Sequence, residues 1–204
     1  MTQAIVPNLL LTSTVAIRLI ACLERLLGKG SNGQNDLLLV STLDLLQGIL
    51  IIHPPSRSLF SREIYMNLLL DLLDPTSCPA IQSSTLLLLV TALLSCPSNT
   101  RTFENVDGLL TVTSLFKTRS TSREVKMKAV EFFYFYLMPE IPYSGTKNDA
   151  RQRSPSKGFG RAGPSAEETR STEEKQGLLG RYLDNVADLV EDLRESVPFG
   201  TSVS

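Results

Sequence analysis

The chain has 204 residues, with 20 Lys and Arg against 21 Asp and Glu, one His, three Cys and no Trp. This length suits one domain or a domain with a tail, and the near-neutral charge argues against a general nucleic-acid-binding protein, which usually carries a basic excess. Three irregularly spaced cysteines, Cys22, Cys78 and Cys96, fit a reducing compartment rather than a disulfide framework. Because His53 is the only histidine, the sequence predicts no histidine-based zinc site. It contains no Walker loop, and we expect no cofactor.

The composition favours helices. Leucine accounts for 35 residues and aromatic residues for 6%, and leucine loses little rotamer freedom in a helix, whereas strands favour β-branched and aromatic residues. The longest apolar stretches, residues 37–52 and 86–94, are shorter than the ~20 residues that cross a bilayer. No basic residue precedes Arg18, unlike in a signal peptide. We therefore expect both stretches to be buried core helices, without membrane insertion.

Six helices are predicted in residues 1–143, where Pro and Gly separate the apolar segments. They cover residues 14–27, 35–52, 58–73, 79–94, 99–115 and 121–137. Their starts recur about every 22 residues, so two helices take about 43–44 residues, the period of armadillo and HEAT-type repeats. The sequence thus predicts an all-α fold, an armadillo/HEAT-like stack of about six helices with one continuous core.

The composition changes after residue 143. Residues 144–171 are rich in Ser, Gly, Pro and charge, which predicts a disordered linker. Residues 172–196 carry apolar side chains at spacings of three and four, which predicts a C-terminal amphipathic helix. Such a helix must bury its apolar stripe, either on the repeat stack or on a partner. Residues 197–204 are predicted to be a disordered tail.

The segment from Cys96 to Arg101 is the strongest candidate for a catalytic motif. A cysteine phosphatase needs five residues between its Cys and Arg, whose amides hold phosphate at a helix N-terminus. Only four residues separate Cys96 from Arg101, and Pro97 removes one amide. We interpret the segment as a turn between helices, and the sequence offers no other recognisable catalytic set and no small-molecule site. A phosphatase using Cys96 and Arg101 remains the alternative hypothesis.

Two features suggest regulation by a partner. Five cations surround the start of the sixth helix: Lys117, Arg119, Arg123, Lys126 and Lys128. They form either a solvated face or a docking site for an acidic or phosphorylated segment. Ser154, followed by Pro155 and Lys157, matches the pattern of proline-directed kinases and is a candidate phosphorylation site.

Long strings of this chain resemble the fungal cell division control protein 14 family, the septation initiation network component and not the phosphatase of the same historical name. The strings are CLERLLGKGSNGQNDLL (22–38), LDLLQGILIIHPPSRSLFSREIYMNLLLDLLD (43–74), FENVDGLLTVTSLFKTRSTSREVKMKAVEFFYFYLMPE (103–140) and GLLGRYLDNVADLVEDLRES (177–196). The resemblance covers residues 15–142 and 172–200. Family members carry a further helical segment before the region that matches Val15, so we expect a shortened gene model or an alternative start.

The resemblance implies an all-helical, armadillo-like and non-catalytic protein. It implies binding to a germinal-centre-type serine/threonine protein kinase, with a role in cytokinesis and septum formation. The implied location is the cytoplasm, with recruitment to the spindle pole body. A general helical-repeat adaptor unrelated to septation is the other alternative.

Overall fold

The structure is a computed structural model that describes residues 6–29, 33–140 and 169–195. Within these residues the chain forms nine α-helices and one 3-10 helix and no strand, which confirms the predicted all-α class. The elements are α1 (Val6–Leu27), α2 (Asp36–Ile52), η1 (Pro54–Ser61), α3 (Glu63–Asp71), α4 (Pro79–Leu93), α5 (Pro97–Asn105), α6 (Gly108–Lys117), α7 (Arg123–Leu137), α8 (Thr172–Leu179) and α9 (Val186–Glu195).

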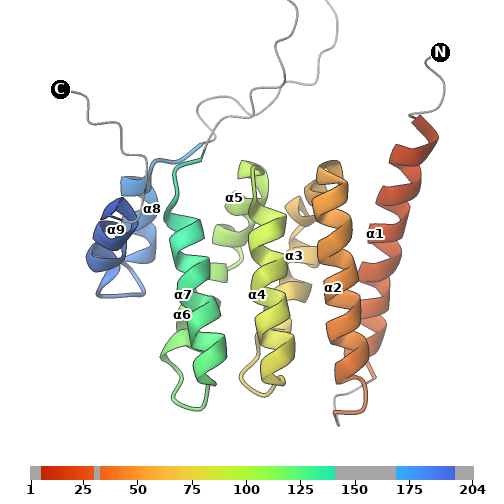
Figure 1. Ribbon diagram of the computed structural model, residues 1–204, viewed down its shortest axis with the longest axis horizontal. Coiled ribbons are helices and arrows are strands. Elements are labelled where there is room, and N and C mark those ends of the chain that lie inside the picture. Colours follow the sequence, from red (N-terminus) through yellow and green to blue (C-terminus); the bar gives the residue numbers. More distant parts are fainter. Residues whose placement is uncertain (1–5, 30–32, 141–168, 196–204) are drawn as a thin grey trace, which may run out of the picture.

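The helices form a two-layer stack of hairpins (Figure 1). One layer consists of α2, α4 and α7, which lie side by side, with α4 in the middle. The second layer contains α1, η1, α3, α5 and α6. Each hairpin pairs one helix of the first layer with the segment that precedes it in the chain, which is α1, η1 with α3, or α5 with α6. The predicted repeat is therefore present as a stack that shares one core.

The core lies between the two layers and is formed largely by leucine and phenylalanine. Helix α4 has no charged residue, as expected for a helix contacted on several sides. Phe103 of α5 and Phe132 of α7 are both fully buried, and their ring centroids lie 5.5 Å apart. Helix α4 thus lies between α2 and α7, and α7 lies between α4 and the C-terminal helices.

Two predicted helices are each divided in the structure. The segment 58–73 becomes η1 and α3, because Pro54 starts a 3-10 helix early and Arg62 is extended, with ψ 124°. The segment 99–115 becomes α5 and α6. Between them Asp107 adopts the left-handed conformation, with φ 59°, which an α-helix cannot continue through.

The C-terminal segment also forms two helices rather than one. Helix α8 begins with a capping box in which Ser171 and Glu174 satisfy each other's backbone amides. Both α8 and α9 pack against α7 and so add a fourth, shorter hairpin to the stack. Of the predicted linker, residues 144–168 lie outside the described residues, as do the tail residues 197–204, whereas residues 169–171 lead into α8.

The prediction that residues 37–52 form a buried core helix is only half correct. Helix α2 buries Leu39, Leu43, Leu46 and Leu50, but it leaves other aliphatic side chains more than half exposed.

In the described ranges, no single helix combines the length and apolarity of a membrane span. One pair, α2 with η1, meets both criteria together but is bent by 117°.

Candidate functional site

A buried ionic cluster joins the end of α7 to the C-terminal hairpin. Glu104, on α5, forms ion pairs with Arg101 and Arg170, at 3.1 Å each. Glu140, just beyond α7, forms ion pairs with Arg101 and, at 3.1 Å, with Lys175 of α8. The two carboxylates therefore bind together three cations that come from α5 and from the C-terminal segment.

The Tyr136 side chain and several backbone groups complete the cluster. The Tyr136 hydroxyl donates a hydrogen bond to Glu104 over 2.8 Å. The Lys175 ammonium donates to the carbonyl of Met138 over 3.0 Å and lies 5.2 Å from the centre of the Tyr136 ring. The backbone amide of Glu140 donates a hydrogen bond to the Arg170 carbonyl, and the Arg170 amide donates one to the Glu140 carboxylate. These two bonds connect the chain segments directly. These contacts hold α8 against the repeat stack.

Burial shifts the pKa values of the cluster in the directions expected for desolvated groups. Burial raises the pKa of Glu104, although the Tyr136 hydrogen bond and the charge of Arg101 oppose this. Burial lowers the pKa of Lys175, and Glu140 opposes that shift. Burial, followed by the charge of Glu104, raises the pKa of Tyr136, so its hydroxyl remains a hydrogen-bond donor.

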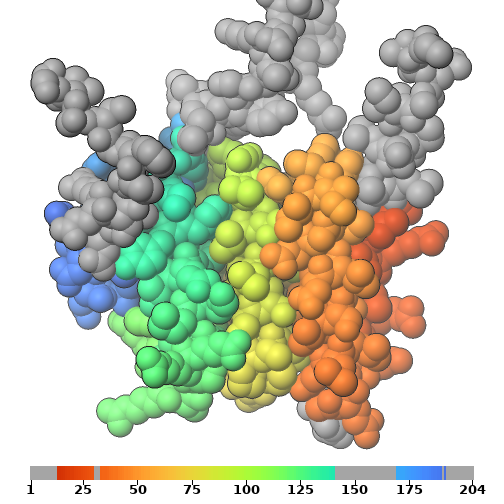
Figure 2. Space-filling view, viewed as in Figure 1, coloured from red at the N-terminus to blue at the C-terminus, as the bar shows by residue number. Residues whose placement is uncertain are grey.

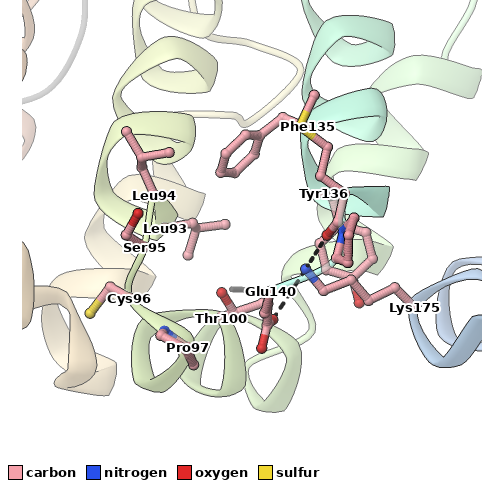
Figure 3. Close-up of a pocket in the computed structure, with 12 residues that line it drawn as sticks. Leu93, Leu94, Ser95, Cys96, Pro97, Thr100, Phe135, Tyr136, Glu140 and Lys175 are labelled. Carbon is pink, nitrogen blue, oxygen red and sulfur yellow. Dashed lines mark hydrogen bonds and ion pairs between the residues drawn. The ribbon is translucent and has the colours of Figure 1, made fainter. Parts of the chain in front are cut away.

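A pocket of about 170 Å³ opens beside this cluster (Figure 3). Its walls come from the ends of α4 and α7, the start of α5 and one residue of α8, and Leu94, Phe135 and Met138 make much of it apolar. Glu140 and Lys175 lie on one side of it, with their charges already paired. The pocket can therefore accept an apolar group at the surface, next to charged groups that are already paired.

Cys96 and Arg101 do not form a phosphate-binding loop. Cys96 lies at the start of α5, where its sulfur is 3.5 Å from the Ser98 hydroxyl. The Arg101 guanidinium is occupied by Glu104 and Glu140. A phosphate group would have to displace two carboxylates to reach it.

The five predicted patch residues all lie around the α6–α7 connection. Lys117, Arg119 and Arg123 are exposed, whereas Lys126 and Lys128 are half-buried. Lys128 forms an ion pair with Glu131, with 2.7 Å between nitrogen and oxygen. Residues two apart on a helix point to different sides, so Lys126 and Lys128 do not share one face. The five cations therefore do not all lie on one face, and Ser154 lies outside the described residues.

Sequence reasoning missed the ionic cluster and the exposed side of α2. The cluster residues are spread from Arg101 to Lys175, and no linear pattern links them. A signal for the second feature was present: residues 37–39 are three consecutive leucines. Since successive helical positions point about 100° apart, all three cannot face the same core.

The fold and this site define an α-solenoid protein whose C-terminal hairpin is fastened to the stack by buried ion pairs. Residues 11–199 match the family described as "Cell division control protein 14, SIN component". The chain is 34% identical over 158 residues to "Cell division control protein 14" of Schizosaccharomyces pombe. The chain therefore belongs to the cell division control protein 14 family, which confirms the resemblance seen in its strings. The match covers 78% of this chain and 58% of the relative. No solved structure matches it.

Proposed function

We propose that this protein is a non-catalytic regulatory or scaffold subunit that binds a germinal-centre-type serine/threonine protein kinase. It would act in the septation initiation network and control cytokinesis and septum formation. The observation that carries the proposal is the family match over residues 11–199, to a septation initiation network component. In the same proposal the protein works in the cytoplasm and is recruited to the spindle pole body.

The helical stack supports a binding role. Solenoids built from stacked hairpins present extended surfaces to their partners. A rigid stack can raise the activity of a kinase only if it binds the active conformation more tightly than the inactive one. Otherwise it localises the kinase without changing its activity. Kinase assays with and without the purified chain distinguish these two mechanisms.

A cysteine phosphatase is the alternative that the structure opposes. Arg101 is held by two carboxylates, and only four residues separate it from Cys96. We expect no hydrolysis of a generic phosphoester by the unmodified chain or by the Cys96→Ser variant. Activity that Cys96→Ser abolishes would establish the enzyme instead.

The cations around the start of α7 are a candidate contact region. Arg123 is exposed and Lys126 half-buried, and both can meet an acidic or phosphorylated segment. If they do, the Arg123→Glu and Lys126→Glu variants will remain folded but lose kinase binding. Unchanged binding would remove this region from the proposal.

Affinity purification of the tagged chain from dividing cells, followed by mass spectrometry, tests the function directly. We expect a germinal-centre-type kinase close to a one-to-one ratio. If a folded chain recovers no kinase, the proposal fails for this chain. Repeating the purification with the full-length relative from Schizosaccharomyces pombe shows whether the additional length of that protein is required.

A further inference from the structure

The outward side of α2 carries an unusual number of exposed aliphatic residues. Leu38, Leu45 and Ile52 are 56%, 62% and 78% exposed and lie seven residues apart. Leu37 and Ile51 are 83% and 57% exposed and flank the same side. Contiguous exposed apolar surface of this kind marks interaction sites. The space-filling view shows α2 on the broad face that it shares with α4 and α7 (Figure 2).

Helix α4 covers a different side of α2. The Gln47 amide of α2 donates a hydrogen bond to the Thr91 hydroxyl of α4 over 3.4 Å, which marks the side on which the two helices meet. Leu45 points about 200° away from Gln47 on the same helix. We define the apolar face as the side of α2 that carries Leu38, Leu45 and Ile52, flanked by Leu37 and Ile51.

The spacing indicates what kind of element fits the apolar face. Apolar positions that recur every seven residues form a straight seam along a helix, and such seams accept the side chains of another helix. Helix-in-groove recognition reads the same pattern on the partner, with anchors at i, i+3 or i+4 and i+7. The expected occupant is therefore an amphipathic α-helix.

The charge of Asp44 indicates whether the apolar face binds a second copy of this chain or a different partner. It is exposed, lies at the middle of α2 and, in the described part of the chain, has no ion-pair partner. A two-fold dimer brings the same patch of both copies together, so pairing through the centre of α2 would place two Asp44 carboxylates against each other among aliphatic groups. Charge complementarity instead requires Lys or Arg opposite Asp44.

We propose that the apolar face binds an amphipathic helix of the kinase partner, with heptad-spaced aliphatic residues and one basic residue that pairs with Asp44. This inference rests on the proposed function, because it assigns the surface through which that function operates.

Capture of the purified kinase by the full chain tests the proposal. The Leu45→Glu/Ile52→Glu variant introduces two charges on the apolar face, and we expect at least about a tenfold loss of affinity. Asp44→Lys, which opposes the basic residue, is expected to weaken binding as well. Ile64→Glu is the matched control, since Ile64 is 65% exposed but lies on α3, in the other layer. Circular dichroism confirms that each variant is folded.

The outcomes separate the inference from the function on which it rests. Loss of capture with Leu45→Glu/Ile52→Glu and Asp44→Lys, but not with Ile64→Glu, supports the apolar face. Equal capture by all folded variants overturns the inference and leaves the proposed function intact. No capture by the unmodified chain overturns the proposed function. Light scattering that shows a dimer, converted to a monomer by Leu45→Glu/Ile52→Glu, would assign the face to a second copy and overturn the inference.

Discussion

Gly108 lies so close to the ring of Phe103 that no other residue fits at this position. A Cβ atom on Gly108 would lie 2.3 Å from two carbons of the Phe103 ring and 2.6 Å from its carbonyl oxygen. Phe103 is itself fully buried and packs against Phe132. The close approach lets the chain turn between α5 and α6 while the ring remains in the core.

We expect Gly108→Ala to lower the free energy of unfolding by about 2–3 kcal/mol, because the methyl group displaces buried backbone and ring atoms. Urea denaturation measures the effect. Gly48→Ala is the control, since its added Cβ meets no atom within 4 Å in the middle of α2. That change should raise stability by about 0.5–1 kcal/mol. Similar losses at both positions would contradict the steric explanation.

Glu140→Gln should be strongly destabilising. The substitution removes the carboxylate that Arg101 and Lys175 share. Breaking a buried ion pair costs about 3–5 kcal/mol. Glu131→Gln removes the exposed ion pair with Lys128, which should cost less than about 1 kcal/mol. Chemical denaturation compares the two variants, and an equal cost would show that burial of the cluster adds nothing.

The raised pKa of Glu104 predicts a pH dependence of stability. The folded protein binds the Glu104 proton more tightly than the unfolded chain, whose carboxyl has the ordinary value of 4.5. As the pH rises from 4.5 through the folded-state pKa, the free energy of unfolding therefore falls. Glu104→Gln should lack this contribution. Urea titrations of both proteins across this range measure the difference, and parallel curves would refute the prediction.

Asn99 connects α5 to η1 and α4 through hydrogen bonds. We therefore expect truncation of its side chain to destabilise the fold. Its amide nitrogen donates to the carbonyls of Arg57 in η1 and Ala92 in α4, over 2.7 and 2.6 Å. Asn99→Ala removes the donor to both carbonyls, of which that of Ala92 is buried, so we expect a loss of about 2–4 kcal/mol. Asn67→Ala, at an exposed position of α3, should change stability by less than about 0.5 kcal/mol. Thermal and urea unfolding of both variants provides the measurement.

Several helix limits could be predicted because their signals are local. The predicted helices 35–52, 79–94 and 121–137 correspond to α2, α4 and α7 within two residues at each end. Pro79 starts α4, and Ser122 caps α7 by accepting a hydrogen bond from the amide of Val125. Proline and capping residues act within one turn, so the sequence contains the information.

The divided helices could not be predicted in the same way. The break at Asp107 depends on the space that the Phe103 ring occupies above Gly108, and that ring is placed by its contact with Phe132 on α7. The ionic cluster has the same origin, since Glu104, Glu140 and Lys175 meet only after α5, α7 and α8 have packed. Long-range packing of this kind leaves no periodic signal.

By itself, the sequence determined the helical class, the repeat period and the family, because propensity, proline punctuation and long matching strings are properties of the linear chain. The tertiary structure decided which apolar residues became core. Leu43 and Leu45 have the same chemistry, yet Leu43 is buried and Leu45 is 62% exposed. Their side chains point about 200° apart on α2, and only the packing of the two layers decides which side is covered.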